Sequence, residues 1–198
     1  MAGLLWPLVL KHGDVTLRPL QRSDRAEWLE VRAANRDWLR PWDATNPSGL
    51  TLEPRFSDVY RGLRRQARQG STLPLAIEFD GRFVGQINLG NIIWGSLRQG
   101  YIGYWIDSRL AGRGLVPTAV AMVSDYALLD MELHRIEINI RPENSASLRV
   151  VEKLGFIFEG MRPKYLHIAG DWRDHNCYVM TSETLPVGGL TQNRPLTH

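Results

Sequence analysis

The chain has 198 residues, of which 43% are hydrophobic and 23% are charged, and its formal net charge is +3 at pH 7. A chain of this length and apolar content can bury a full core as one domain, which excludes a fibrous, repetitive or low-complexity protein. The single cysteine, Cys177, excludes an internal disulfide and is typical of proteins from a reducing cytoplasm.

The beginning of the chain predicts neither a signal peptide nor a membrane anchor. Residues 2–10 are largely apolar, but they lack a basic leading segment and a small-residue cleavage site. No later apolar run is long enough to cross a bilayer. We therefore expect a cytoplasmic protein without a membrane partner.

The first half of the chain predicts strands and helices in alternation. Residues 15–20 alternate as a strand does, and Ser23 is a candidate N-cap for the helix that follows. A second helical region is expected over residues 52–69. Two strand-like runs then flank Asp80-Gly81, a pair typical of a tight hairpin turn.

A glycine-containing loop is the best indication of function. Segment 109–114, with the sequence R-L-A-G-R-G, lies between an aromatic strand-like run at 101–106 and an apolar helical run at 115–129. Glycines let a backbone approach an anion closely, and the first turn of a helix attracts phosphates. A P-loop would need a Lys-Ser/Thr pair after the second glycine, and a dinucleotide fingerprint would need a glycine at Pro117. The pattern therefore predicts another kind of phosphate cradle, with a chance glycine turn as the alternative.

A second motif follows the glycine loop. Residues 133–140 alternate as a strand, Asn144 is a good N-cap for the next helix, and residues 156–160 resume a strand. This unit reads N-x-x-S from Asn144 to Ser147, then six residues, then L-G-F at 154–156. Together with the R-x-x-G-x-G loop, it resembles the GCN5-related N-acetyltransferases (GNAT), in their RimJ/RimL branch.

Three further segments are similar to RimJ-type members of that branch, the ribosomal-protein-alanine N-acetyltransferases. They are residues 35–42, 95–104 and 164–175. The resemblance implies an α/β (α+β) GNAT fold with a central mixed, mostly antiparallel twisted sheet of about seven strands, helices on both faces and a splay after the fourth strand. We expect one domain over residues 1–183. Because the chain then turns polar and rich in Gly and Pro, a disordered tail is predicted over 184–198.

The resemblance implies acetyl-CoA as the co-substrate, without a metal. In GNAT proteins the free backbone groups of the splayed strand hold the pantetheine arm, and the glycine loop holds the pyrophosphate. Arg109 and Arg113 add charge there or are solvated surface residues, and Asn144 bonds the pantetheine amide or only caps its helix. The implied coenzyme-binding residues are Trp105, Ile106, Arg109, Gly112, Arg113, Gly114, Leu115, Val116, Pro117, Thr118, Asn144 and Ser147.

The resemblance also implies direct attack of an amine on the thioester. It gives Ser147 the role of protonating the departing thiolate, with a helix-surface hydroxyl as the alternative. Glu137 is the first candidate for the general base, with an ion pair to Arg135 or Arg141 as the alternative, and His167 is the second candidate. An α-amino group has a pKa of roughly 7.7–8, so deprotonation at pH 7 costs only about 1 kcal/mol, against about 4.6 kcal/mol for lysine.

The implied acceptor is the α-amino group of a protein N-terminus, such as a ribosomal-protein alanine. A small-amine or antibiotic acetyltransferase and a non-catalytic coenzyme A-binding or ribosome-assembly module are the alternatives. Trp38, Trp42 and Trp94 are candidates for an acceptor groove, whereas Trp28 is expected in the core. The basic segment 61–68 predicts either a solvated helix face or a weak ribosome contact through RNA.

Other reactive residue types give weaker signals. Cys177 has no paired base in the sequence pattern, so a cysteine acyl intermediate is not expected. The five histidines show no metal-ligand spacing. Both a monomer and a homodimer are compatible with the sequence.

Overall fold

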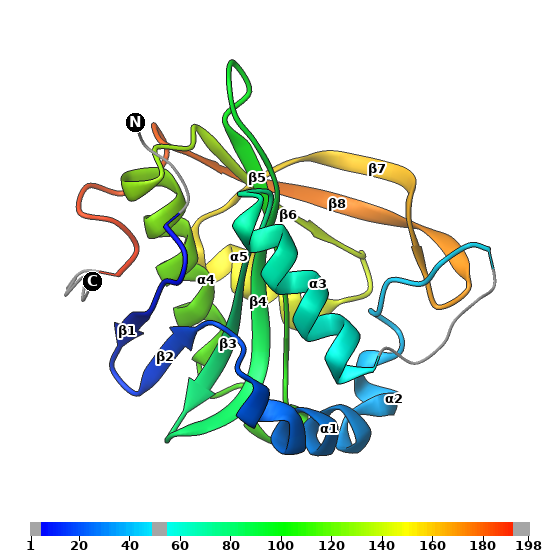
Figure 1. Cartoon of the computed structure of the whole chain (residues 1–198). Helices are drawn as coiled ribbons and strands as arrows, with labels where there is room; N and C mark the ends of the chain where they lie inside the picture. Colours follow the sequence, from blue (N-terminus) through cyan, green and yellow to red (C-terminus); the bar gives the residue numbers. More distant parts are fainter. Residues whose placement is uncertain (1–4, 49–54, 192–198) are drawn as a thin grey trace.

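The computed structural model describes residues 5–48 and 55–191, which are built around an eight-stranded sheet (Figure 1). The strand order is β1-β2-β3-β4-β5-β6-β8-β7, and all neighbours are antiparallel except β5 and β6, which are parallel. The strands are β1 (Leu10–His12), β2 (Val15–Arg18), β3 (Leu73–Phe79), β4 (Arg82–Ile93), β5 (Gln99–Ile106), β6 (Arg135–Ile140), β7 (Ile157–Ile168) and β8 (Asp171–Thr181). This architecture confirms the predicted fold class.

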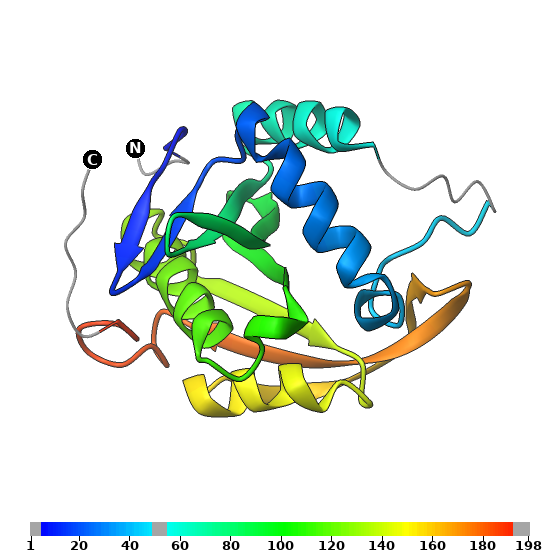
Figure 2. The same ribbon diagram turned by 90° about the horizontal axis from the view of Figure 1, so that it is seen from below.

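Helices cover both faces of the sheet, as Figure 2 shows from below. One face carries α1 (Arg25–Ala34) and α3 (Phe56–Arg68), and the other carries α4 (Leu115–Asp125) and α5 (Ser145–Leu154). The short α2 (Arg36–Leu39) follows α1, a π-helical turn (Tyr126–Asp130) continues α4, and two 3-10 turns are Arg22–Asp24 and Ser108–Leu110. None of the described helices is long and apolar enough to cross a membrane.

The strand alternation of β5 divides the core into two layers. Ile102 and Ile106 belong to the larger core cluster under α4 and α5, whereas Trp105 packs against the smaller cluster of α1 and α3. Successive side chains of a strand point to opposite faces, so the two layers follow directly from the sequence of this strand. As predicted, Trp28 lies in the core, where its indole N–H donates to Gln86 Oε1 at 2.9 Å.

The sheet opens between its two parallel strands. β5 pairs with β6 only over Gln99–Arg135, Gly100–Ile136 and Tyr101–Glu137. From residue 102 to 106, β5 keeps its partner β4 but has no ladder partner on the β6 side. This is the splay expected after the fourth strand; the additional strand β1 shifts the numbering by one.

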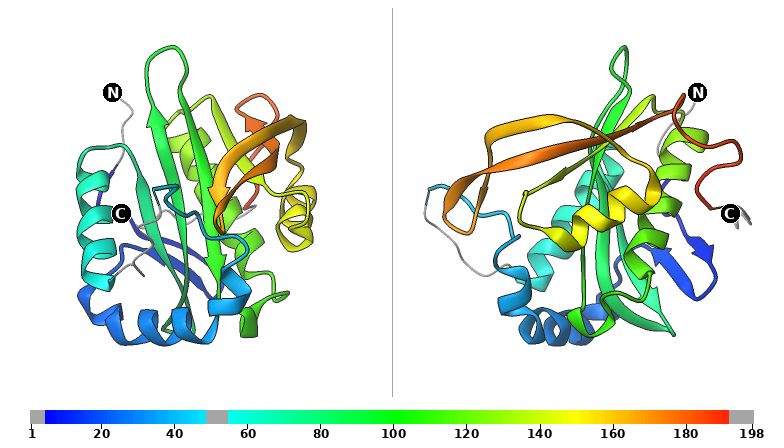
Figure 3. Two further views of the ribbon diagram at one scale, coloured as in Figure 1. Left: turned by 90° about the vertical axis from the view of Figure 1, so that its right-hand side faces the viewer. Right: turned by 180° about the vertical axis from the view of Figure 1, so that it is seen from behind.

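The β7–β8 hairpin extends to one side beyond the central strands (Figure 3). Its outer end is tied to the segment after α2, because Ala44 forms an isolated antiparallel bridge with Ile168 and Thr45 N–H donates to the His167 carbonyl at 2.9 Å. These contacts fix the segment after α2 against the β7–β8 hairpin.

Three local predictions need correction. Ser23 does not cap α1: it lies in the 3-10 turn, and Asp24, buried against Arg18, is the N-cap position. The helical region expected over residues 52–69 corresponds to α3, which begins at Phe56, and residues 52–54 lie outside the described residues. The segment 184–191 was predicted to be part of a disordered tail, but it folds back onto the end of α4, while 192–198 lie outside the described residues.

A buried carboxylate explains this fold-back. Asp125 is 1% exposed and accepts the backbone N–H groups of Leu190 at 2.7 Å and Thr191 at 2.9 Å. The composition of the segment did not indicate this contact, because Asp125 and Leu190 are 65 residues apart in the sequence.

We expect Asp125→Asn to lower the free energy of unfolding by about 2 kcal/mol. The asparagine NH2 group would replace one carboxylate oxygen, so one buried backbone N–H would lose its acceptor. Urea denaturation followed by circular dichroism measures this change. Glu152→Gln, an exposed acidic residue on α5, is the matched control. Equal stability of both variants would contradict the role of Asp125.

Candidate active site

The glycine loop connects β5 to α4 and presents backbone N–H groups. Gly112 and Gly114 have φ values of 81° and 84°, the left-handed region that side chains disfavour. A Cβ atom at either glycine would meet nothing within 4 Å, so the loop borders open space. Within the described residues, no protein acceptor takes the N–H groups of 112–114. The loop therefore combines free donors with the N-terminus of α4, which suits a phosphate.

A buried polar contact fixes the start of this loop. Asp107 is 3% exposed and accepts from Asn35 Nδ2 at 3.1 Å, while Asn35 Oδ1 accepts from the Ser108 N–H at 2.8 Å. Burial opposes ionisation of Asp107, but hydrogen bonds from Arg109 outweigh it and hold the pKa of this carboxyl below its ordinary value. Asn35 thus joins the end of α1 to the loop.

The open edge of β5 continues the loop toward the middle of the sheet. Asp107 N–H donates to the Val84 carbonyl in β4 at 2.9 Å. Because backbone groups alternate sides along a strand, we expect the N–H groups of Tyr104 and Ile106 to face the gap toward β6. An extended ligand lying in this gap would complete the ladder that β6 leaves unformed.

The first turn of α5 forms the other wall of the gap. Asn144 Oδ1 accepts the Ser147 N–H at 3.1 Å, which makes Asn144 a helix cap. The Tyr104 hydroxyl is buried without a hydrogen-bond partner among the described residues. Burial raises the pKa of Tyr104 to about 12, although its polar neighbour Ser147 lowers it in part. A buried phenol and a serine hydroxyl therefore lie together at the splay.

A cleft of about 370 Å³ joins these parts. It runs from the glycine loop along β5 and α5 to the segment around α2. Its lining residues are Trp38, Leu39, Trp42, Asp43, Tyr104, Trp105, Ile106, Leu110, Ala111, Gly112, Gly114, Leu115, Val116, Pro117, Asn144, Ala146, Ser147, Arg149, Val150 and Lys153.

Comparison with known proteins identifies the family. Residues 14–157 match the model of the acetyltransferase (GNAT) domain. The chain belongs to the GNAT family of N-acetyltransferases. It is therefore an acetyltransferase that uses acetyl-CoA, and the free N–H groups of the loop, the open β5 edge and the buried Tyr104 hydroxyl fit that co-substrate.

Several relatives match the GNAT chain over most of its length. "Probable N-acetyltransferase YjcK" of Bacillus subtilis (strain 168) is 34% identical over 84% of this chain and 93% of its own. The [ribosomal protein uS5]-alanine N-acetyltransferase of Escherichia coli (strain K12) is 31% identical over 82% and 84%. The solved structure of Mycobacterium smegmatis RimJ in complex with CoA-disulfide superposes with a TM-score of 0.87 at 37% identity, over 94% and 93%.

The structure places most of the implied coenzyme-binding residues on the GNAT cleft, but not all of them. Arg109 turns back onto Asp107, with 2.6 Å between Nη2 and Oδ2. Arg113 stacks on the Phe79 ring, with its guanidinium carbon 4.9 Å from the ring centroid. Neither arginine lines the cleft, and neither does Thr118. The cationic side chains that do line it are Arg149 and Lys153, which the motif pattern did not single out.

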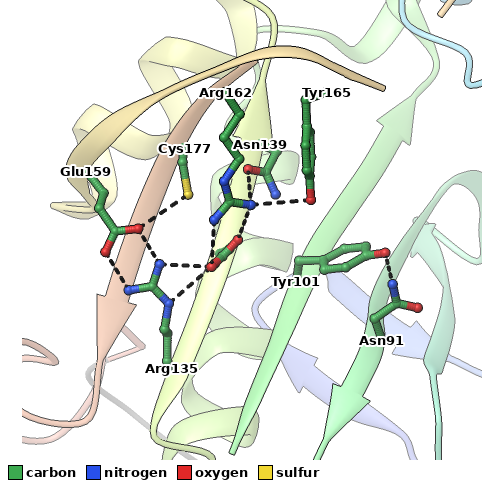
Figure 4. Close-up of polar contacts among 9 residues, drawn as sticks. Asn91, Tyr101, Arg135, Asn139, Glu159, Arg162, Tyr165 and Cys177 are labelled. Atoms are coloured by element: carbon green, nitrogen blue, oxygen red, sulfur yellow. Dashed lines mark hydrogen bonds and ion pairs between the residues drawn. The ribbon is translucent and has the colours of Figure 1, made fainter. Parts of the chain in front are cut away.

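Glu137 lies in an ion-pair network with Arg135 and Arg162, which Figure 4 shows, and it is absent from the cleft lining. Its carboxylate is 2% exposed and pairs with Arg162 and Arg135, each at 2.8 Å. Arg135 also pairs with Glu159 at 2.5 Å. Burial would raise the pKa of Glu137, but the hydrogen bonds from both arginines outweigh it and hold the pKa below its ordinary value. This geometry favours the ion-pair interpretation, with Arg162 as a partner that the sequence did not indicate.

The second base candidate, His167, holds the segment after α2. Its Nδ1 lies 2.7 Å from Thr45 Oγ1, its ring contacts Trp172, and it is absent from the cleft lining. Burial raises the pKa of the Cys177 thiol to about 11, which suits a structural cysteine. The Cys177 sulfur lies near Glu137 and Glu159, but guanidinium groups already occupy both carboxylates, so this cluster is unsuited to a cation.

The far end of the cleft is aromatic and acidic. Trp38 and Trp42 line it as predicted, whereas Trp94 is 37% exposed and is absent from the lining. The guanidinium of Arg141 lies 5.4 Å from the Trp42 ring centroid. Asp43 is the carboxylate in the lining, and it pairs with Arg32 at 2.7 Å. The sequence analysis did not single out Asp43 or Tyr104 as site residues, although Tyr104 lies in one of the segments that resemble RimJ-type proteins.

We expect Gly114→Ala to raise the KM for acetyl-CoA about tenfold or more, since a side chain at φ 84° costs about 1–2 kcal/mol and shifts the loop N–H groups. Steady-state kinetics with varied acetyl-CoA measures this change. Gly62→Ala on α3, which also meets nothing within 4 Å but has no left-handed φ, is the control. An unchanged KM in Gly114→Ala would contradict the cradle.

We expect Glu137→Gln to lower the free energy of unfolding by about 3 kcal/mol at neutral pH, because it leaves two arginines without their shared partner. The pKa of Glu137 is lowered in the folded state, so its stabilisation is present above pH ~4.5 and is lost as pH falls through the folded pKa. The difference from the wild type should therefore shrink in acid. Denaturation of both proteins at a series of pH values measures this difference in stability. A kcat about a hundredfold lower in a fully folded Glu137→Gln variant would instead identify Glu137 as the base.

Proposed function

We propose that this acetyltransferase transfers the acetyl group of acetyl-CoA to the α-amino group of a protein N-terminus, with a ribosomal-protein alanine as the first substrate to test. The observation that carries the proposal is the continuous cleft from the glycine loop to the wall of Trp38, Trp42 and Asp43. The likeness to the uS5-alanine N-acetyltransferase of Escherichia coli and to Mycobacterium smegmatis RimJ supports the acceptor class.

The chain's own groups divide the work of the reaction. The N–H groups of 112–116 bind the pyrophosphate, and the open edge of β5 aligns the pantetheine arm. The N–H of Ile106 donates to the acetyl carbonyl oxygen, which stabilises the negative charge that develops there. Ser147 supplies a proton to the departing thiolate. The Tyr104 hydroxyl, which has no partner among the described residues, turns to donate to the Ser147 oxygen as that oxygen loses its proton.

Asp43 receives the acceptor amine in this proposal. An α-ammonium needs only about 1 kcal/mol to lose its proton at pH 7, so a water molecule held by Asp43 is sufficient as the proton acceptor. Trp38 and Trp42 pack on the first residues of the entering chain. The cleft thereby favours an amine of low pKa over a lysine side chain, whose deprotonation costs about 4.6 kcal/mol.

Mass spectrometry of a peptide panel with acetyl-CoA tests the acceptor class. We expect acetylation at the α-amino group of peptides that begin with Ala or Ser, and much less at internal lysines or at polyamines. Peptides blocked by N-terminal formylation are the matched control. Turnover of polyamines alone would replace the proposal with a small-amine acetyltransferase, and no turnover with any acceptor would leave a coenzyme A-binding module.

We expect Ser147→Ala to lower kcat by about a hundredfold with little change in the KM for acetyl-CoA, because the lost group acts on the departing thiolate. Tyr104→Phe should lower kcat less, and the double variant should be no slower than Ser147→Ala, since both act on one proton. Steady-state kinetics over a pH series measures these effects. A full rate in Ser147→Ala would remove it from the mechanism.

A further inference from the structure

The outer face of α3 carries a cluster of arginines that the cleft does not use. Arg61, Arg64, Arg65 and Arg68 recur at helical spacing along about 10 Å of one face. Arg22 from the turn before α1 joins them. Together with Tyr60 and Gln69 these side chains line a hollow of about 530 Å³, here called the arginine surface.

The arginine surface differs from the rest of the molecule in its ion pairing. Several arginines elsewhere lie against carboxylates, as in the pairs Arg18–Asp24, Arg32–Asp43 and Arg162–Glu137. On the arginine surface, Arg61 alone has an acidic partner among the described residues, Asp58 at 2.6 Å. No ion pair joins Arg22, Arg64, Arg65 or Arg68 to a carboxylate within residues 5–48 and 55–191.

This arrangement concentrates the charge of the chain. Five arginines line the hollow, and among the described residues Asp58 is the carboxylate that pairs with one of them, so this surface has an excess of four positive charges. The whole chain has a net charge of only +3. The remainder of the molecule is thus close to neutral. An excess of one sign in a single hollow attracts a partner of the opposite sign.

Tyr60 organises the guanidinium groups. Arg22 and Arg64 lie over its ring, with their central carbons 5.9 and 5.4 Å from the ring centroid, and Phe56 stacks on the same ring. Planar guanidinium groups held in place bind phosphates through paired N–H donors and also stack on nucleobases.

We propose that the arginine surface binds the phosphate backbone of a structured RNA. An anionic membrane is less compatible, because insertion needs exposed apolar side chains, and the exposed large hydrophobic residues include none on α3. An acidic peptide could pair with the positive charges, but unlike RNA it has no bases to stack on the flat guanidinium groups around Tyr60. Since α3 packs beside α1 (Figure 2), an RNA bound there would lie on the same face of the sheet as these two helices.

Fluorescence anisotropy of a labelled hairpin RNA of mixed sequence, titrated with the full chain over a salt series, tests this proposal. Log Kd should rise linearly with log salt. In the variant R64Q/R65Q/R68Q, we expect Kd to weaken about tenfold or more at low salt and the slope to fall by about 2 to 3. The variant R64K/R65K/R68K should retain most of the slope, because it keeps the charges.

The matched control K11Q/R82Q/K164Q removes three exposed positive charges outside the arginine surface, and RNA affinity should change little. An equal loss in the control would overturn the proposal, since the binding would then reflect bulk charge. Tighter binding of poly-glutamate or of phosphatidylglycerol vesicles than of RNA would overturn it as well. Circular dichroism checks that each variant is folded. If the triple variant is not folded, the same titration is done with the single variant R65Q.

Discussion

The absence of a ladder between β5 and β6 beyond Tyr101–Glu137 is the constraint on which the molecule depends. A sheet gains stability from each backbone pair, and unpaired groups must find another partner. Here the gap is bordered by the glycine loop at one end and by the first turn of α5 along its side. The fold thus maintains an unsatisfied strand edge, which a ligand with amide groups can satisfy.

The ion-pair network stands at the last paired residues of that opening. Glu137 is the final β6 residue in register with β5. It pairs with Arg135 on its own strand and with Arg162 on β7, and Figure 4 shows both arginines. Breaking such a buried pair is costly because charges remain without partners. The network therefore joins β6 to β7 within one half of the sheet, at the level where the ladder to β5 ends. This geometry gives the buried carboxylate of Glu137 a structural role.

Local sequence patterns predicted the elements that repeat or that carry motifs. The strand alternation, the Asp80-Gly81 turn and the cap at Asn144 depend on neighbouring residues, so the sequence alone predicted them. Contacts between distant segments were not. Asp43 lines the cleft on a segment that contacts with His167 and Ile168 hold in place. Arg162 pairs with Glu137, which is 25 positions away in the sequence. The Arg109 side chain pairs with Asp107 instead of extending toward the glycine loop. Each depends on the fold rather than on spacing.

The docking of Leu190 and Thr191 on Asp125 has a practical consequence. Asp125 ends α4, and Gly114 begins it, so the two lie about 16 Å apart along the helix axis. The last described residues therefore lie at the opposite end of α4 from the glycine loop. A substitution that loosens this docking would act at a distance from the mouth of the cleft, so its effect on stability could be measured separately from its effect on substrate binding.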